Sequence, residues 1–466
     1  MRIHFLGAAG NVTGSRYWLD APDCQCLVDC GLVQERALQA RNWDPFPVPP
    51  ASLQAVLLTH AHLDHCGYLP RLVKEGFKGR IFCTAPTAEI ARLVLLDSAR
   101  LQTEDAAFKR KRHAREGRQG PYPEEPLYQV ADVEATVARF QTVDYRRPVS
   151  VGRGIEATFF DAGHILGSSL IRIDCPGRDR PRRLLFSGDI GRRDRPLLED
   201  PDRASSADYI QIESTYGDRL HDDTKPIPER LAEEIRATHA RGGILLMPSF
   251  AVERAQEILY HLRELFENGA IPRMKVFLDS PMATEVTGIY RRHIDLLDKE
   301  AQTLFREGRS PFDFPELHYI RTPDESKALN QLRDPAIIIA GSGMCTGGRI
   351  KHHLLNHIGK PTTTVLFIGY QSVGTLGRII QDGAPEVRIH GQICTVRAHI
   401  ETIHGFSGHA DRGELLRWIS GLPQAPRGIF VTHGEPESAA SFAAYLRQET
   451  GWPVTVPAYR DVVELE

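Results

Sequence analysis

The stretch "LLTHAHLDHCGYLP", residues 57–70, constrains the fold more than any other part of the chain. An apolar run is followed, within six positions, by His60, His62, Asp64 and His65. Such a run is typical of a buried strand, and imidazole and carboxylate groups held together at its end form a chelate for a borderline metal such as zinc. Alternatively, the histidines make ordinary hydrogen bonds and Asp64 caps a helix that begins there. Four such groups together favour the metal site.

The same pattern recurs along the chain. Short apolar runs end in an acidic residue or a histidine in "CLVDCG", "ATFFDAGHILGS", "LLFSGDIG", "YIQIESTYG" and "GIFVTHGE". The polar residues that follow these runs are Asp29, His164, Asp189, Glu213 and His433. Each alone could be a turn aspartate, a loop histidine or a residue at a helix start. Together these groups suffice for two adjacent metals, with His60, His62 and His164 on one, Asp64, His65 and His433 on the other, and Asp189 able to bridge.

Length and composition set broad limits. A chain of 466 residues is expected to form two domains, and its 41% hydrophobic and 25% charged content is typical of a soluble globular protein. The net charge of −3 restricts any phosphate-binding surface to a local patch. No signal peptide and no membrane-spanning apolar run are found, so a cytoplasmic location is expected. The eight cysteines include no CxxC pair and are expected to be reduced, mostly buried thiols.

A second pattern appears between about Tyr209 and Cys394. Strand, small-residue loop and helix alternate there, which predicts a parallel, helix-flanked sheet. Ser280 followed by Pro281 indicates a helix start. The glycines of "GSGMCTGG", from residue 341, would let the backbone approach an anion closely, although the loop could equally be a set of tight turns. The histidines of the next predicted helix, His352, His353 and His357, are expected at the surface.

The first pattern returns after this block, which predicts an insertion. Residues 1–208 and 395–466 are expected to form one domain around the metal site, interrupted by a helix-flanked domain at 209–394. The segment "FKRKRHAREGRQGPYPEE", which starts at residue 108, reads as a basic loop. Charge runs are usually solvated faces, so direct substrate contact by this segment is the less favoured interpretation.

The order of these motifs resembles a known family. "THAHLDH", "GHILGS" and "SGDIG", preceded by Asp29, resemble the metal motifs of the metallo-β-lactamase superfamily, and "IESTYG", "FSGHAD" and "THGE" resemble the further motifs of its β-CASP nuclease branch. The resemblance implies an α/β fold in which an αββα sandwich carries an inserted β-CASP domain with a parallel, helix-flanked sheet. It also implies hydrolysis of nucleic-acid phosphodiester bonds.

The last motif bears on the substrate. Histidine at the position of His433 accompanies RNA-processing members of the branch, whereas DNA-repair members typically carry valine. The chain is therefore similar to bacterial ribonucleases that resemble the catalytic subunit of the pre-mRNA 3′-end cleavage factor. Because it begins at its first strand and stops soon after the last motif, neither the KH domains of archaeal relatives nor the extra C-terminal domain of ribonuclease J is expected.

The resemblance also implies roles for individual residues. Two zinc ions, or manganese in their place, would be held by His60, His62, Asp64, His65, His164, Asp189 and His433. Asp29 would support a ligand histidine rather than bind metal itself. His409 would protonate the leaving 3′-oxygen and Glu213 would orient it, so that the products carry 5′-phosphate and 3′-hydroxyl ends.

Several points stay open from the sequence. The groups expected to hold flanking phosphates are Gly341, Ser342, Gly343, Gly347, Gly348, Ser372, Arg378 and Ser407, with Arg378 as a bidentate clamp. The expected substrate is single-stranded RNA, cut internally or from the 5′ end, by a monomer or a homodimer. The alternatives are a thioester hydrolase of the glyoxalase II type, which would have no evident use for Glu213 and His409, and a non-catalytic RNA-binding subunit, which would not need every metal ligand.

Overall fold

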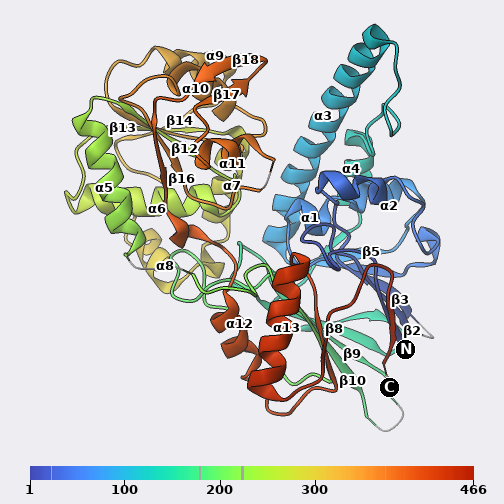
Figure 1. Cartoon of the computed structure of the whole chain (residues 1–466). Coiled ribbons are helices and arrows are strands. Elements are labelled where there is room, and N and C mark those ends of the chain that lie inside the picture. The colour runs from blue at the N-terminus through green and yellow to red at the C-terminus, as the bar shows by residue number, and fades with distance from the viewer. Residues whose placement is uncertain (22–23, 178–179, 222–224, 373, 466) are drawn as a thin grey trace. The chain divides into compact units, whose positions relative to one another are not determined.

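The chain folds into two compact units (Figure 1). A computed structural model describes residues 1–21, 24–177, 180–221, 225–372 and 374–465. The first unit comprises Met1–Asp194, Asp200–Leu220 and His409–Glu466, and the second comprises Arg195–Glu199 and His221–Gly408. The helix-flanked part is thus inserted into the chain of the first unit. The exact domain boundaries at 208/209 and 394/395 stay a prediction.

Two seven-stranded sheets form the centre of the first unit. The strands of the first sheet, in spatial order, are β22 (Val462–Glu464), β1 (Arg2–Phe5), β2 (Tyr17–Ala21), β3 (Cys24–Val28), β4 (Ala55–Leu57), β5 (Arg80–Cys83) and β6 (Phe140–Thr142). Those of the second are β21 (Val454–Thr455), β20 (Gly428–Val431), β11 (Tyr209–Ile212), β10 (Arg182–Phe186), β9 (Ser169–Cys175), β8 (Ile155–Asp161) and β7 (Pro148–Gly152). Short, β-branched and aromatic-rich runs bounded by turn residues explain these strands.

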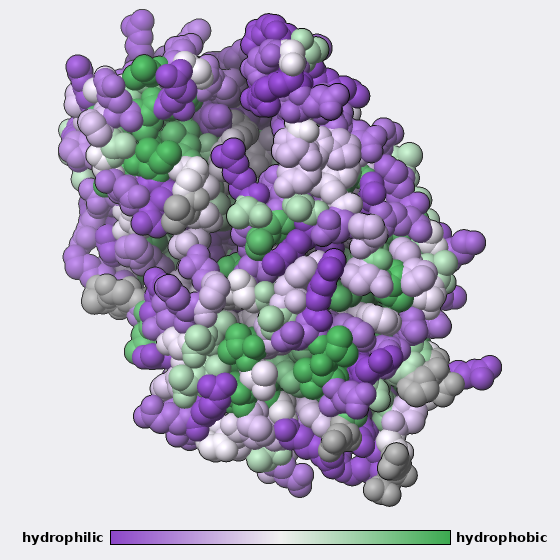
Figure 2. Space-filling model, turned by 45° about the vertical axis from the view of Figure 1, so that its right-hand side comes forward, coloured by the Kyte–Doolittle hydropathy of each residue, from purple (hydrophilic) through white to green (hydrophobic). Residues whose placement is uncertain are grey.

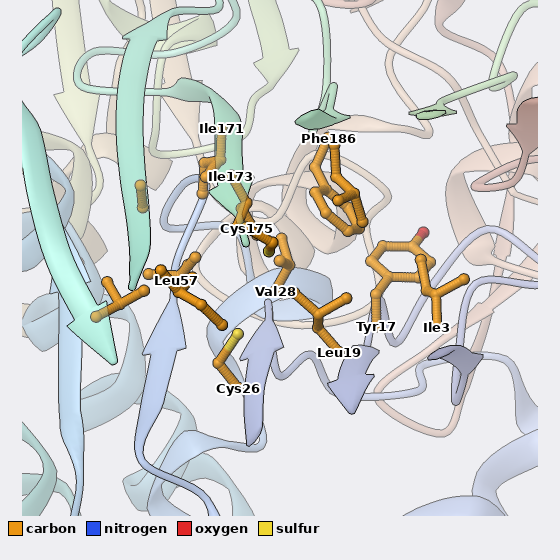
Figure 3. Close-up of a cluster of buried hydrophobic side chains, with 14 of the residues drawn as sticks. Ile3, Tyr17, Leu19, Cys26, Val28, Leu57, Ile171, Ile173, Cys175 and Phe186 are labelled. Carbon is orange, nitrogen blue, oxygen red and sulfur yellow. The ribbon is translucent and has the colours of Figure 1, made fainter. Parts of the chain in front are cut away.

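The hydrophobic core of the first unit lies between the two sheets (Figure 3). Alternate side chains of the first sheet, including Tyr17, Leu19 and Val28, meet Ile171 and Phe186 of the second sheet in one buried cluster. Because strand side chains alternate between faces, each sheet presents this apolar face to the other. Burying each large side chain contributes about 1.5–3 kcal/mol, which fixes the two sheets and thus the strand ends that carry the polar residues.

Helices cover the outer faces of the sandwich, which gives the αββα arrangement (Figure 1). Beside the first sheet lie α1 (Leu63–Cys66), α2 (Leu69–Lys74), α3 (Ala85–Glu116) and α4 (Val130–Val137), with short 3-10 turns at Arg36–Asn42 and Pro50–Ser52. Beside the second sheet lie α12 (Arg412–Ile419) and α13 (Pro436–Thr450), whose Trp418 and Phe442 share a buried cluster with Ile210 and Ile429.

The segment from residue 108 that reads as a basic loop is instead largely helical. It forms the last part of α3, which runs for 32 residues from an N-cap at Thr84 to Gly117, whose left-handed conformation ends the helix. Lysine, arginine, alanine and glutamate all have high helix propensity, and this local preference, with a buried stripe of Ala99, Ala106 and His113 at seven-residue spacing, extends the helix through the charged run. The expectation of a loop was therefore wrong up to Glu116.

The second unit is built on a parallel sheet flanked by helices, as predicted. Its strands, in spatial order, are β14 (Leu317–Tyr319), β13 (Lys275–Asp279), β15 (Ala336–Ala340), β12 (Ile244–Pro248), β16 (Thr364–Phe367) and β19 (His399–Thr402), and a separate hairpin joins β17 (Glu386–Ile389) to β18 (Gln392–Thr395). The helices are α5 (Ile227–Ala240), α6 (Arg254–Glu267), α7 (Pro281–Arg292), α8 (Lys299–Arg306), α9 (Pro323–Ala328), α10 (Ile350–His357) and α11 (Leu376–Gln381), with 3-10 turns at Ile294–Leu296, Leu329–Gln331 and His404–Phe406. The helix start predicted at Ser280 is confirmed, since its side chain accepts a hydrogen bond from the amide of Ala283.

One expectation about the second unit was wrong. His353 and His357 are fully buried rather than at the surface, whereas His352 is exposed. His353 Nε2 lies 2.6 Å from Asp279 Oδ2 at the end of β13, and Asp279 also accepts hydrogen bonds from Ser326 and Arg349. His353 is buried because it is one of the hydrogen-bond partners that the buried carboxylate of Asp279 requires. This pairing is tertiary and leaves no local signal in the sequence.

Surface and thiol properties follow the composition. The face of the molecule shown in Figure 2 is mostly hydrophilic, with scattered apolar residues. All eight cysteines are free thiols and seven are buried, as expected. Within the described residues, no helix is both long and apolar enough to cross a membrane.

Candidate metal centre

Parallel strands bring the predicted polar residues to one edge of each sheet. In the first sheet, β3 and β4 are parallel neighbours, so Asp29 and the segment that carries His60 leave the sheet at the same edge. In the second sheet, β10, β11 and β20 are parallel neighbours, so Asp189, Glu213 and His433 leave it together. Because the carboxyl ends of parallel strands share an edge, residues far apart in sequence become neighbours.

The first cluster contains His60, His62, His164 and Asp189. His62 Nδ1 lies 3.1 Å from His60 Nε2 and 3.2 Å from His164 Nε2. Asp189 Oδ2 lies 3.3 Å from His60 Nε2 and 3.6 Å from His164 Nε2. Four ligand atoms from three different loops therefore converge on one point.

The second cluster contains Asp64, His65 and His433. His65 Nε2 lies 3.1 Å from His433 Nε2, and Asp64 Oδ2 lies 3.4 Å from His433 Nε2. Asp189 Oδ1 lies 3.3 Å from His65 Nε2. The two oxygens of Asp189 thus face different clusters, which is the geometry that a carboxylate bridging two cations requires.

The spacing fits bound metal. Tetrahedral zinc with bonds of about 2.0–2.1 Å to nitrogen holds its ligand atoms about 3.3–3.4 Å apart, close to the separations in both clusters. Asp189 Oδ1 is buried and has no hydrogen-bond partner among the described residues. A buried carboxylate oxygen without a donor is costly unless a cation faces it. The donor set of five imidazoles and two carboxylates suits zinc, and the clusters can therefore hold metal.

The pKa shifts of the histidines also support metal binding. Burial, together with the neighbouring His65, lowers the pKa of His60 to about 3, and burial lowers the pKa of His62 to about 4, so both are neutral ligands at neutral pH. Burial also opposes charge on His65, but the carboxylates of Asp189 and Asp29 outweigh it and raise the pKa of His65 well above its ordinary value. This buried group of carboxylates demands nearby positive charge, which a divalent cation supplies.

Asp29 lies behind the second cluster rather than in it. Its side chain is 1% exposed, and its Oδ2 lies 2.7 Å from His65 Nδ1. The same carboxylate accepts hydrogen bonds from the amide and the hydroxyl of Thr59 at 2.8–3.0 Å. A carboxylate at Nδ1 keeps the proton on that nitrogen and leaves Nε2 of His65 available to a metal.

Glu213 and His409 form a pair beside the first cluster. His409 Nδ1 lies 3.0 Å from Glu213 Oε2, and the ring of His409 lies 4.6 Å from that of His164. Glu213 is fully buried, and its other oxygen accepts a hydrogen bond from the amide of Ile190 at 2.6 Å. Burial opposes the charged form of His409, but Glu213 and nearby aspartates raise its pKa to about 9.

Two threonines that were not predicted from the sequence also belong to the site. The Thr59 hydroxyl lies 3.0 Å from His60 Nδ1, so the same residue that anchors Asp29 also orients a ligand of the first cluster. The Thr215 hydroxyl donates to Glu213 Oε2 at 2.6 Å and lies 3.2 Å from His433 Nδ1. Hydroxyl residues are common at strand ends, so only their place directly before or within a metal motif could have indicated them.

The residues predicted to bind phosphate lie in the second unit. The loop of Gly341, Ser342, Gly343, Gly347 and Gly348 connects β15 to α10, and the segment with Ser372 and Arg378 lies against it, since Gly377 donates to Met344 and Gln371 donates to Gly343. Ser407 directly follows the 3-10 turn His404–Phe406.

Part of this predicted anion site is used internally. The amides of Ser342 and Gly347 bond within the loop, and Arg378 Nε bonds to both oxygens of Asp382 at 2.8 and 3.0 Å. With Nε engaged in this way, Arg378 would contact a phosphate through its Nη1 and Nη2 groups. The role of these residues stays a prediction.

Three domain models match the chain. Residues 18–182 match a metallo-beta-lactamase superfamily domain, residues 255–380 match a Beta-Casp domain, and residues 394–457 match a Zn-dependent metallo-hydrolase RNA specificity domain. These ranges cover both units and contain most of the motifs described above.

Known proteins of similar sequence agree. The chain is 38% identical over 447 residues to "Ribonuclease TTHA0252" of Thermus thermophilus, which covers 96% of each chain, and 32% identical over 480 residues to "Transcription termination factor FttA" of Methanocaldococcus jannaschii, which covers 100% of this chain and 72% of that one. A solved structure titled as a protein of unknown function from Enterococcus faecalis V583 shares the fold, with a TM-score of 0.55 at 12% identity over 100% of this chain and 99% of that one. The chain therefore belongs to the β-CASP branch of the metallo-β-lactamase superfamily.

Proposed function

We propose that the protein is a metal-dependent ribonuclease that hydrolyses RNA phosphodiester bonds with two zinc ions, to give 5′-phosphate and 3′-hydroxyl ends. The observation that carries this proposal is the position of Asp189, whose two oxygens lie 3.3 Å from histidines of two different clusters. A single carboxylate between two ligand clusters supports a pair of adjacent cations. The ribonuclease named among the relatives and the RNA specificity domain model support RNA as the substrate.

The metal ions and the residues that hold them would have the following roles in hydrolysis. Bound metal ions would supply Lewis-acid neutralisation of the phosphate and would activate a water molecule as the nucleophile. His60, His62 and His164 would hold the first ion, Asp64, His65 and His433 would hold the second, and Asp189 lies between the two groups with one oxygen toward each. Most of these side chains are buried, which strengthens the charge interactions among them.

His409 is the proton donor to the leaving 3′-oxygen. Its Nδ1 faces Glu213, so Nε2 is the atom that delivers the proton, and its side chain remains 22% exposed and thus open to substrate. Glu213 fixes the ring and stabilises the imidazolium, as in other carboxylate–imidazole acids. Because water is the nucleophile, the 2′-hydroxyl of the RNA takes no part in bond breaking.

The proposal also covers the form of the RNA, the location, the metal and the oligomeric state. Single-stranded RNA is the expected substrate, cut internally with a 5′-exonuclease mode as the variant to be distinguished. The cytoplasm is the expected location, manganese is the alternative metal, and a homodimer stays a prediction.

The test compares two substrates with the same zinc-loaded protein. We expect cleavage of a 30-nucleotide single-stranded RNA to fragments that carry 5′-phosphates, identified by mass spectrometry, and no hydrolysis of S-lactoylglutathione, the substrate of glyoxalase II. Fragments of intermediate length indicate internal cleavage, and immediate mononucleotides indicate 5′-exonuclease action. Thioester hydrolysis without RNA cleavage would overturn the proposal.

A further inference from the structure

The end of α3 carries a charged surface that the metal centre does not use. We define the basic arm as residues 108–118, "FKRKRHAREGR", which contains six lysines or arginines and one acidic residue. Beyond Ala99, the buried residues of α3 are Ala106 and His113. The arm therefore touches the rest of the first unit along one narrow stripe and presents its other sides to solvent (Figure 1).

The arm is nevertheless anchored. His113 Nδ1 pairs with Glu124, the amide of Leu127 donates to Gln102 at 3.1 Å, and the hydroxyl of Tyr128 donates to Ser98 at 2.8 Å. These contacts hold the returning segment against α3. A helix fixed in this way presents its exposed side chains in a constant arrangement.

Among the described residues, three cations on the arm form no close ion pair, and of these Arg110 also interacts with Glu124 at longer range. Within the described chain, Arg110, Lys111 and Arg115 form no ion pair, whereas Lys109 pairs with Asp105 at 2.6 Å. Cations favour the last turn of a helix, but that effect falls off within one turn and does not account for Arg110 and Lys111. Lys111 and Arg115 are like charges four residues apart, which destabilise a helix slightly. A bound anion would relieve that repulsion.

An exposed aromatic side chain lies among these cations. Phe108 is 63% exposed, and Lys111 and Arg115 follow it at three and seven residues, so all three share one face of the helix. Solvent exposure of a phenyl ring brings no stability. A planar apolar ring beside cations is the combination that binds single-stranded nucleic acid, in which bases stack on the ring and phosphates meet the charges.

We propose that the basic arm is a second RNA-binding site, separate from the metal centre, in which Phe108 stacks on a base and Arg110, Lys111 and Arg115 contact phosphates. The inference rests on the proposed ribonuclease function and extends it to RNA outside the cleavage site. The arm serves to retain long substrates rather than to take part in bond breaking.

The structure sets the length of RNA that can reach both sites. Thr84 at the start of α3 donates to Gly167 at 2.7 Å, in the loop that carries His164. Phe108 lies 24 residues further along the helix, which at about 1.5 Å per residue is about 36 Å. At about 3.4 Å per stacked nucleotide, roughly 11 nucleotides span that length. A 6-nucleotide RNA is therefore too short to use both sites, and a 30-nucleotide RNA is long enough.

The experiment measures binding and its salt dependence. Fluorescence anisotropy is recorded for labelled 6- and 30-nucleotide single-stranded RNA with the zinc-loaded His409→Ala protein, and a gel checks that the RNA stays intact. In this background the triple variant Arg110→Gln, Lys111→Gln, Arg115→Gln is compared with a control of equal charge change, Lys78→Gln, Arg153→Gln, Arg417→Gln, whose residues are also exposed and in the first unit.

We expect the triple variant to bind the 30-nucleotide RNA at least tenfold more weakly and to lower the slope of log affinity against log salt by about 2, which corresponds to three lost phosphate contacts at about 0.7 each. Phe108→Ala should weaken the same RNA about fivefold or more without changing the slope. Binding of the 6-nucleotide RNA and the behaviour of the control variant should not change.

Two results would overturn the inference. Unchanged affinity and slope for the 30-nucleotide RNA would mean that the arm does not bind RNA, as when it instead meets an acidic protein surface. Equal weakening in the control variant would mean that the effect is one of net charge alone. Both leave the ribonuclease proposal intact, whereas absence of RNA binding and cleavage by the unmutated protein refutes that proposal first.

Discussion

Replacing Asp29 by asparagine should weaken one metal and spare the other. In the structure its carboxylate lies 2.7 Å from His65 Nδ1 and accepts hydrogen bonds from the amide and the hydroxyl of Thr59. Asparagine keeps one oxygen for Thr59 but can turn its NH₂ group toward the Nδ1–H of His65, which favours the tautomer with the proton on Nε2. That proton occupies the atom that faces His433, so the second cluster loses a ligand.

The size of the effect follows from the hydrogen bond that is lost. A hydrogen bond to a charged group contributes about 1.5–3 kcal/mol, and loss of such a supporting partner weakens metal binding about 10–100-fold. Competition with a calibrated zinc chelator should give wild-type affinity for one zinc per chain and reduced affinity for the other. Circular dichroism should show an unchanged fold.

A matched control separates this effect from general destabilisation. Asp208 is also buried in the first unit and accepts hydrogen bonds from Arg180 and from the amide of Arg183, away from both clusters. Asp208→Asn should cost stability without changing zinc affinity. If Asp29→Asn bound both zinc ions as tightly as the unmutated chain, the assignment of Asp29 as the support of His65 would be wrong.

Three further predictions concern the acid, a buried glutamate and the core. His409→Ala should slow RNA cleavage by about 10²–10⁴-fold with unchanged zinc content. An RNA with sulphur in place of the leaving 3′-oxygen should recover most of the rate, because a sulphur leaving group needs no proton. A slow rate of the variant with that substrate would exclude His409 as the acid. Burial, and then repulsion from Glu257, raise the pKa of Glu253 from 4.5 to about 7. Through this pH range the folded chain therefore holds a proton that the unfolded chain has lost, so the free energy of unfolding falls by up to about 3 kcal/mol as the pH rises. Glu253→Gln should flatten that fall in urea unfolding measured from pH 5 to 8. An unchanged pH profile in the variant would contradict this role of Glu253. Phe186 is 1% exposed and lies between the two sheets, so Phe186→Ala should lower the free energy of unfolding in urea by about 3–5 kcal/mol. Leu101 is 57% exposed, so Leu101→Ala should lower it by less than about 0.5 kcal/mol. Equal losses would refute the packing argument.

The grouping of the candidate site's residues could be predicted from the sequence because its signal is local and repeated. Each polar residue follows a short apolar strand, and parallel pairing of β10, β11 and β20 then brings Asp189, Glu213 and His433 to one sheet edge. Periodicity and turn residues likewise gave the parallel sheet of the second unit and the helix start at Ser280. These features depend on residues close in sequence, which is what pattern reasoning can read.

The features that were missed depend on contacts distant in sequence. His353 is buried because Asp279, at the end of a strand far along the chain, needs a partner. The basic segment is helical in part because Ala106 and His113 are buried along one side of α3. The residues that follow it, "GRQGPYP", have the composition of a loop. Thr59 orients two histidines with a hydroxyl group that many strand ends carry without any function. His353 and Thr59 are thus placed by tertiary contacts, whereas the helix also reflects the high helix propensity of its lysines, arginines and alanines.

RNA cleavage by this protein should require two metal ions, held by the two clusters that share Asp189. The most direct measurement titrates zinc into chelated, dialysed protein and records initial rates on a 5′-labelled single-stranded RNA by denaturing gel, with bound zinc per chain measured in parallel. We expect little cleavage with up to one zinc per chain and a rise in rate as the second zinc binds. Full cleavage by the metal-free or one-zinc protein, or none by a chain shown to hold two, would contradict it.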